Sequence, residues 1–446
     1  MRGCSMKLLK RTLILVTLLI SCLLTYAGGG QETVEKVTIK FESDEVEFPQ
    51  EFIDRFNAQN PDIELVRIDI EWNRRIADMM AGTAADLLLI ATGTSVGYFS
   101  RRGLLLDITA RLKNSAVIRY EDIDLLGNSS YRFDGEEWGQ GPWYGLSKDY
   151  NNIGCITYNR VMFDEAGLSQ LSETEPITYY DDLYGLARKL TKKDQEGRNL
   201  IWGIDFSLWW VGFLVSDMAY AEGLSLYADQ DRSKMNEDPR VRSLWEYWLR
   251  FSVEDIGSNF RNVVPQSSMT GFQNDRVAMV QLGYWYGAML MENEGYETKY
   301  GWAPTPILRP GAGRVTNTLG ATGYGIYSKT KHPDEAFRVF EYYIGGEYGL
   351  ERAKTGWGIP PLLSLRKYLP VDNAYNRSRT RIALDDAKYF VPWQASPHTY
   401  GGLGYVEWDD GVKDVVEKVI DEEGFIDRLY ADLNATLKRG KEELGL

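Results

Sequence analysis

The sequence contains few of the side chains on which enzyme and metal chemistry usually depends. Among its 446 residues are three cysteines and two histidines. No HExxH zinc motif and no Walker-type phosphate loop occurs. Histidine and tyrosine ligands are not clustered at a recognisable metal-binding spacing, so we expect no metal and no cofactor. A protein without catalytic residues is the first expectation, and paired acids such as Asp409 and Asp410 are read as solvated surface.

Long hydrophobic runs are also missing, apart from one near the N-terminus. Lys7, Lys10 and Arg11 precede an apolar run over 13–24 that is followed by small and polar residues. At about 12 residues the run is shorter than the roughly 20 that a membrane-spanning helix needs. This pattern predicts a secretory signal peptide over 1–27 and a flexible linker over 28–33.

Two processing routes remain open for this signal. Thr25-Tyr26-Ala27 resembles a signal-peptidase site and is favoured, whereas Leu19-Ile20-Ser21-Cys22 resembles a lipobox, in which Cys22 would carry a lipid. Both routes predict an exported protein in the periplasm or cell envelope. Cleavage after Ala27 leaves Cys155 as the remaining cysteine, so no intrachain disulfide is expected and Cys155 is interpreted as a buried core residue.

Excess positive charge is absent as well. The formal charge is −14, and removal of residues 1–27 takes away four basic residues and no acidic ones, which gives −18. This sign opposes nucleic-acid binding. Aromatic residues are plentiful, at 13%, and several stand together among glycines and polar residues, as in "WWVGF", "GYWYG" and "VPWQ". Such groups suit the apolar faces of carbohydrates.

The order of the predicted elements indicates an α/β fold. An alternating strand at 36–43 precedes a helical pattern that ends at Asn60-Pro61, and a second strand follows. A helix around 74–81 then leads to "ADLLLIAT", a continuous apolar run typical of a strand that is covered on both faces. The C-terminal part of the chain is mainly helical in pattern. A chain of this length predicts two lobes.

Seven blocks in order resemble the family of extracellular sugar-binding proteins that includes the maltodextrin receptors. Among them are "FIDRFNAQNPDIELV", "WYGLSKDYNNIGCITYN", "FQNDRVAMVQLGYW" and "GYGIYSKTKHPDEAF". The resemblance implies a periplasmic-binding-protein type II fold, with two α/β lobes of mixed sheets joined by hinge strands. It places the lobe crossings near "GLSKD" and "GATGYG". The implied N-terminal lobe comprises 34–147 and 324–369, and the C-terminal lobe comprises 148–323 and 370–446.

A sugar site needs aromatic rings for the apolar face of a pyranose and polar groups for its hydroxyls. The resemblance places Trp285, in "LGYW", at the family's sugar-stacking position, and Tyr284 could serve instead. It also implies a stacking role for Trp408 and a cleft-lining role for one of Trp209 and Trp210, since neighbours on a helix point about 100° apart.

Polar contacts are expected from the ends of the strands in the first lobe and from the hinge. Asp44 follows the first strand, and ligands in open α/β folds bind beyond the carboxyl ends of strands. Asp149, after the first crossing, is expected to accept a hydroxyl. Neutral and rim contacts are expected from four further residues, Thr92, Thr94, Gly320 and Trp357.

These features predict the substrate-binding component of an ABC importer, a monomer that closes around a sugar-like solute and delivers it to a membrane permease. Thr92 and Thr94 stand where the maltodextrin-type pattern presents charged groups, which speaks against maltodextrin itself. A secreted carbohydrate-active enzyme, or the same receptor for a peptide or polyol, remains the alternative.

Overall fold

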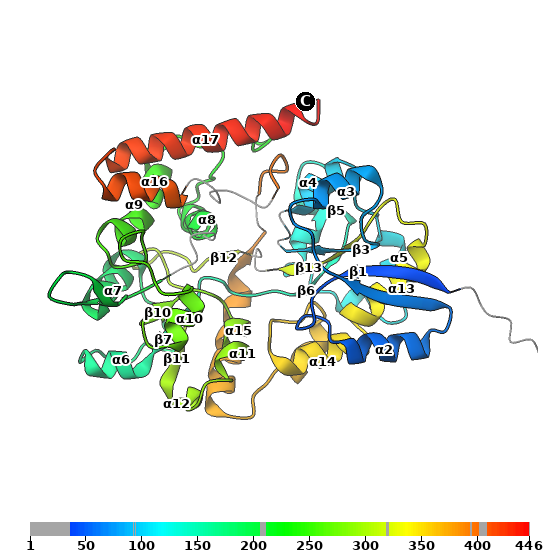
Figure 1. Ribbon diagram of the computed structural model, residues 1–446, viewed down its shortest axis with the longest axis horizontal. Coiled ribbons are helices and arrows are strands. Elements are labelled where there is room, and N and C mark those ends of the chain that lie inside the picture. The colour runs from blue at the N-terminus through cyan, green and yellow to red at the C-terminus, as the bar shows by residue number, and fades with distance from the viewer. Residues whose placement is uncertain are drawn as a thin grey trace, which may run out of the picture.

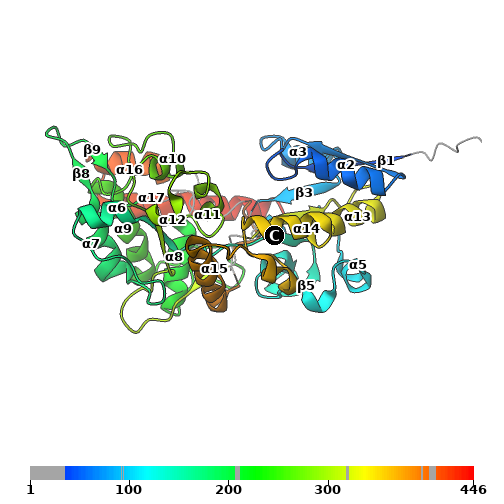
Figure 2. The same cartoon turned by 90° about the horizontal axis from the view of Figure 1, so that it is seen from below.

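The computed structural model describes residues 36–91, 93, 95–205, 211–317, 321–392, 395–400 and 408–445. The described chain forms two lobes that lie side by side along the long axis of the molecule (Figures 1 and 2). The first lobe contains the N-terminal strands together with a later segment of the chain. The second lobe contains the middle of the chain and the C-terminal helices.

A mixed five-stranded sheet, of order β2-β1-β3-β13-β6, forms the centre of the first lobe. Strand β1 pairs in parallel with β2 and β3, and β13 pairs antiparallel with both β3 and β6. The strands are β1 (Val37–Glu42), β2 (Ile63–Ile68), β3 (Leu87–Ile90), β6 (Leu146–Asp149) and β13 (Thr322–Ile326).

The first unit of this lobe follows directly from its sequence pattern. Helix α2 (Gln50–Gln59) joins β1 to β2 and buries Phe52, Ile53 and Phe56, which share one face because of their spacing. Its cap is Asn60, immediately before Pro61, where helical backbone is disfavoured. The predicted strand, helix and strand are therefore confirmed. The other helices of the lobe are α3 (Arg75–Ala81), α4 (Ser95–Arg101), α5 (Thr109–Asn114), α13 (Pro333–Ile344) and α14 (Glu347–Thr355).

The chain passes between the lobes next to the edge of this sheet. Both segments that were predicted as crossings form strands here, β6 and β13, and these strands are hydrogen-bonded neighbours. A third segment joins them through the antiparallel bridge between Tyr150 and Ile359. Three stretches that are distant in sequence thus run together at the hinge. The assignment of each stretch to one lobe stays a prediction.

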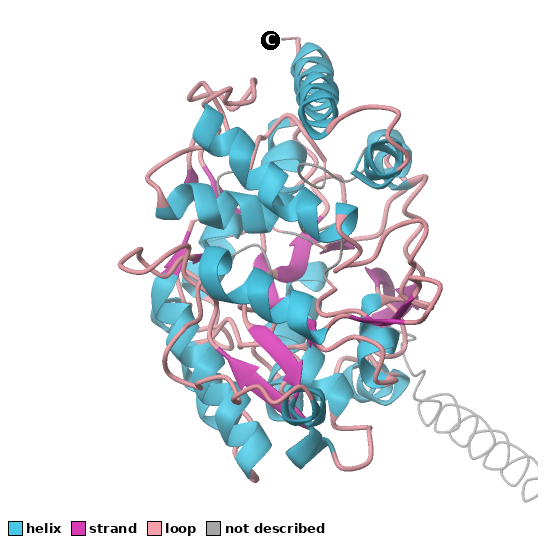
Figure 3. Cartoon of the chain, turned by 90° about the vertical axis from the view of Figure 1, so that its left-hand side faces the viewer, coloured by secondary structure: helices cyan, strands magenta, loops and turns pink. Residues whose placement is uncertain are grey.

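The second lobe has a smaller, antiparallel sheet of order β10-β7-β11 that is surrounded by helices (Figure 3). Cys155 lies beside it, buried and unpaired, and burial raises the pKa of its thiol. This confirms the interpretation of Cys155 as a core residue. The strands are β7 (Ile156–Asn159), β10 (Met279–Val280) and β11 (Tyr300–Ala303). The helices are α6 (Arg160–Glu165), α7 (Tyr184–Leu190), α8 (Val211–Ala221), α9 (Pro239–Val253), α10 (Ser268–Gln273), α11 (Tyr286–Leu290), α12 (Tyr296–Lys299), α15 (Ala374–Asp386), α16 (Trp408–Val416) and α17 (Glu422–Glu442).

Short strand pairs complete the structure. They are β4 (Arg132–Phe133) with β5 (Trp138–Trp143), β8 (Lys192–Lys193) with β9 (Asn199–Ile201), and β12 (Thr316–Asn317) with β14 (Phe390–Val391). No helix within the described ranges is long and apolar enough to cross a membrane. The mixed α/β architecture confirms the predicted fold class.

The lobes meet on two sides. Helices α14 and α15 lie on one side of the hinge strands, and the long helix α17 runs along the other, so that its C-terminal end comes close to the first lobe (Figure 1). We call these the α14 side and the α17 side. On the α17 side, residues 395–400 pack against both lobes: the Trp138 indole donates to the carbonyl of Ala395, and the amide of Ser396 donates to the Tyr227 hydroxyl. Ala395 belongs to a hydrophobic core that contains residues of both lobes, among them Ile90 and Tyr284, and its assignment to the second lobe stays a prediction.

Candidate ligand-binding site

Five of the predicted site residues, Thr92, Thr94, Trp209, Trp210 and Gly320, lie outside the described residues. Trp408 is the first residue of α16, and its side chain also lies outside the description. The predicted residues that can be placed in full are Asp44, Asp149, Tyr284, Trp285 and Trp357. The structure brings two of them, Trp285 and Trp357, into contact.

An aromatic pair on the α14 side is the most direct feature for a sugar. The rings of Trp285 and Trp357 lie 16° from parallel, with their centroids 6.5 Å apart, and both side chains are partly exposed. A pyranose between the rings would need a contact distance of about 3.5–4.0 Å on each side, which exceeds this separation. The rings therefore do not form a slot. A sugar can contact an outer face or the shared edge of the pair.

Trp285 is held in place by the hinge. Its backbone N–H donates to Oδ1 of Asn151, two residues beyond β6, at 2.8 Å. Gly283 has a φ of +87°, which favours glycine, and a side chain there would approach Asn151 to 3.2 Å. The turn before Trp285 thus needs glycine for conformation and for space. The resemblance to the sugar-binding family identified Trp285 in the sequence. It did not identify Asn151, which positions Trp285.

Tyr284 points away from the partly exposed rings. Its side chain is fully buried, and its hydroxyl lies 2.8 Å from the hydroxyl of Thr380 on α15. In this arrangement Tyr284 packs the hinge rather than offering a surface to solvent. The role of Tyr284 as a substitute stacking residue stays a prediction, and the burial of its side chain does not support that role.

Asp149 belongs to a group of four charges at the hinge, of which Glu47 is the most exposed. Its Oδ2 lies 2.6 Å from Arg352 Nη2 on α14 and 3.1 Å from Lys148 Nζ. Glu47, in the loop after β1, lies 2.9 Å from both Lys148 and Arg352. We call these four residues the hinge quartet. Oδ2 of Asp149 already faces two cations. If Asp149 accepts a hydrogen bond from a ligand hydroxyl, as predicted, Oδ1 is the oxygen that would accept it.

The electrostatics of the quartet favour its charged form. Burial raises the pKa of Glu47, but the neighbouring cations Lys148 and Arg352 outweigh this effect and lower its pKa to about 2. Arg352 has a pKa held above its usual value, because the surrounding acidic and phenolic groups outweigh its burial. Sequence analysis missed three residues of this group, Glu47, Lys148 and Arg352. They belong to no recognisable sequence motif, and Arg352 is separated from Asp149 by about 200 positions in the sequence.

Asp44 lies in the loop between β1 and α2, where it was expected. The side chain is exposed, and Oδ1 accepts a hydrogen bond of 2.8 Å from the backbone N–H of Glu47. One carboxylate oxygen therefore shapes the loop that carries Glu47. The other carboxylate oxygen, Oδ2, leaves Asp44 able to contact a ligand as part of the first lobe.

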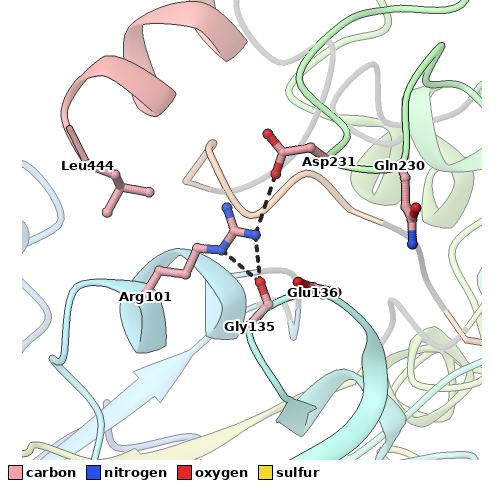
Figure 4. Close-up of a pocket in the computed structure, with 6 residues that line it drawn as sticks. All are labelled: Arg101, Gly135, Glu136, Gln230, Asp231 and Leu444. Atoms are coloured by element: carbon pink, nitrogen blue, oxygen red, sulfur yellow. Dashed lines mark hydrogen bonds and ion pairs between the residues drawn. The ribbon is translucent and has the colours of Figure 1, made fainter. Parts of the chain in front are cut away.

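A second opening lies on the α17 side. A cavity of about 560 Å³ separates the lobes there (Figure 4). It is lined by Arg101, Gly135, Glu136, Gln230, Asp231 and Leu444. Arg101 donates to the carbonyl of Gly135 and lies 3.6 Å from Asp231. None of these six described lining residues is aromatic, and none of them was predicted as a site residue.

A nucleophile pattern in the sequence does not develop into a catalytic site. Residues 93–97 read G-x-S-x-G, and Ser95 is the first residue of α4, which follows β3 as in the strand-to-helix context of a hydrolase serine. A serine nucleophile needs a histidine within hydrogen-bond reach. His398 Nε2 instead lies 3.2 Å from Asp231, and His332 caps α13. In the described part of the chain neither histidine bonds to Ser95, and no cluster of three or more metal-ligating residues occurs.

Comparison with known proteins agrees with this architecture. A family model described as bacterial extracellular solute-binding protein matches residues 42–349. No curated protein matches the sequence of this chain. Solved structures of similar fold cover nearly the whole chain at low sequence identity, so that they bear on the fold alone.

Three of these structures are representative. An ABC substrate-binding protein from Listeria monocytogenes, in complex with cycloalternan, has a TM-score of 0.71 and 18% identity, covering 90% of this chain and 99% of its own. An ABC transporter solute-binding protein from Thermotoga lettingae, bound with α-D-tagatose, has a TM-score of 0.69 and 20% identity, covering 90% and 100%. A maltose/maltodextrin-binding domain from Bdellovibrio bacteriovorus, bound to maltotriose, has a TM-score of 0.68 and 17% identity, covering 91% and 100%.

Proposed function

We propose that this chain, which belongs to the family of bacterial extracellular solute-binding proteins, captures a sugar-like solute between its lobes for an ABC importer. The observation that carries the sugar assignment is the aromatic pair at the hinge, where Trp285 of the second lobe meets Trp357 of the segment after α14. Flat, partly exposed indoles match the C–H face of a pyranose. The sugars named for the three structural neighbours agree with this class.

The mechanism that we propose is lobe closure. A solute that touches Trp285 on one lobe and Asp44 on the other makes both contacts only when the lobes approach. Such a difference in contacts is what shifts a population from open to closed. The closed form then presents the solute to a membrane permease, and no chemical step is required of the protein. The described residues offer no assembled catalytic group that would add one.

Export follows from the extracellular character of the family. We propose a monomer that is released by cleavage after Ala27 or anchored through a lipid on Cys22. The acidic charge of −14 supports the absence of a nucleic-acid partner. Mass spectrometry of the protein from its native envelope distinguishes the two processing routes, since acylation at Cys22 leaves a characteristic added mass.

The direct test is a thermal-shift screen with monosaccharides, oligosaccharides, polyols and short peptides. A ligand that binds only the folded protein raises the melting temperature. We expect a rise with at least one sugar and none with the peptides. Small-angle scattering with the hit should show a smaller radius of gyration than without it. New reducing ends released from oligosaccharides would instead identify an enzyme.

A further inference from the structure

Arg379, on α15, is a fully buried cation, and no carboxylate of the described residues lies within ion-pair distance of it. A buried charge is costly unless hydrogen bonds replace its lost hydration. The Arg379 guanidinium obtains its bonds from neutral groups. Its Nε donates to Asn376 Oδ1 at 2.8 Å, and Nη1 donates to the carbonyl of Gly356 at 3.0 Å and more weakly to that of Tyr284 at 3.4 Å.

The two carbonyls belong to the residues that directly precede the aromatic pair. Gly356 comes before Trp357, and Tyr284 comes before Trp285. Figures 1 and 2 show α15 beside α11, on the part of the second lobe that faces α14. One guanidinium thus ties together the backbones of the two segments, which are separated by more than 70 positions in the sequence.

The surroundings of Arg379 are shaped to admit it. The guanidinium carbon lies 4.6 Å from the centroid of the Tyr284 ring, a favourable cation–π position. A Cβ on Gly356 would lie 2.6 Å from Arg379 Nη2, and a Cβ on Gly287 would lie 2.9 Å from Arg379 Cδ. Both segments therefore carry glycine where the arginine passes. Gly356 also has a φ of +68°, which favours glycine.

We infer that Arg379 is a positioning residue of the ligand site: through the carbonyls of Gly356 and Tyr284 it fixes Trp357 against Trp285 and so sets the aromatic surface that a sugar contacts. The inference rests on the proposed function. Arginine suits this task because Nε bonds to Asn376 while Nη1 reaches both carbonyls, whereas lysine offers a single nitrogen for all three acceptors. Arg379 itself does not touch the ligand.

The test uses the full mature protein and two variants. Arg379→Lys keeps the charge and loses the fork, and Gly356→Ala pushes a methyl group against the guanidinium and against the ring of Pro370. Gly82→Ala is the matched control, because Gly82 also follows a helix, has a φ of +83° and has open space around its Cβ. The control carries the same backbone cost without disturbing Arg379. Arg377→Lys, at an exposed arginine of the same helix, is the second control.

The first measurement needs no ligand. Two indoles at this separation give a circular dichroism couplet when their transition dipoles are turned relative to each other within the ring planes, and the far-ultraviolet difference between wild type and Trp357→Phe isolates that couplet. We expect both test variants to lose most of the couplet and both controls to keep it. If the folded test variants retain the wild-type couplet, the inference is overturned, whatever the protein binds. If Arg379→Lys does not fold, Gly356→Ala decides the result.

The second measurement is calorimetric affinity for the sugar identified by the thermal-shift screen. We expect Gly356→Ala to weaken binding about tenfold and Gly82→Ala to leave it unchanged. In a Trp357→Ala background, Gly356→Ala should cause no further loss, because its effect passes through the ring. An equal loss in that background would overturn the positioning role. A wild-type protein that binds no sugar would refute the proposed function, whereas the couplet still reports on Arg379.

Discussion

The two sides on which the lobes meet are built from different contacts. On the α14 side, the Lys148, Asp149 and Arg352 side chains of the hinge quartet are 6%, 9% and 10% exposed, and that of Glu47 is 27% exposed. On the α17 side, Arg102 is equally covered at 10%, but its partner Glu443 is 52% exposed. The ion pair of Arg232 with Glu137 has the same asymmetry. In each of these α17-side pairs, water reaches one partner.

This difference assigns a different role to each side. An ion pair that is open to water contributes little, about 0–1 kcal/mol, and can separate without leaving a buried charge. Breaking one partner of a buried group leaves an uncompensated charge and is costly. Separating the lobes is therefore expected to cost more on the α14 side than on the α17 side. The four predictions below test this contrast.

The largest effect is expected from removing one cation on each side. Arg352→Met leaves Glu47 and Asp149 with Lys148 alone, and it should lower the free energy of unfolding by about 3 kcal/mol. Arg102→Met, which removes an equally covered arginine, should lower it by less than about 1 kcal/mol. Urea titration followed by circular dichroism measures both. Equal losses would remove the proposed difference between the two sides.

The next effect concerns the aromatic pair. Trp285→Ala should weaken sugar binding by about 2 kcal/mol, roughly thirtyfold, and leave the fold intact, because the ring is partly exposed. Trp72→Ala, at a more exposed tryptophan, serves as control. Calorimetry gives the affinities. Unchanged affinity in Trp285→Ala would exclude the pair from the site, and global unfolding would make Trp285 a core residue.

Acid should remove the stabilisation that the α14 side gains from the charged form of Glu47. The pKa of Glu47 is about 2 in the folded protein, below the value of about 4.3 in unfolded chains. The unfolded state then binds the extra proton, so the stabilisation is complete above pH 4.3 and declines as the pH falls towards 2. The slope from this group reaches at most about 1.4 kcal/mol per pH unit. Unfolding titrations of wild type and Glu47→Gln between pH 5 and 2.5 should show a shallower decline in the variant.

The sequence could predict the elements of the first lobe because their signals are local. The alternation of β1, the spacing of apolar residues in α2 and the continuous apolar run of β3 each lie within about ten residues. The aromatic residue Trp285 was predicted from the resemblance of a short block. Local signals and blocks do not reveal partners across the chain, which is why Asn151, Arg352 and Arg379 were missed. Each of these side chains acquires its role through a contact at the hinge that folding creates.

The smallest effect on stability is expected at the end of α17, yet this change bears most directly on opening. Glu443→Gln weakens the pair with Arg102 across the lobes, whereas Glu442→Gln weakens the pair with Lys438 inside the same helix. The two substitutions remove the same charge from adjacent exposed positions, and each should change the free energy of unfolding by less than about 0.5 kcal/mol. A contact that exists only when the lobes are together shifts the equilibrium between open and closed forms by its own free energy. We therefore expect scattering without ligand to show a slightly larger radius of gyration than wild type for Glu443→Gln. For Glu442→Gln we expect the same radius of gyration as wild type. Identical radii for the two variants and wild type would mean that the α17 side does not contribute to closure.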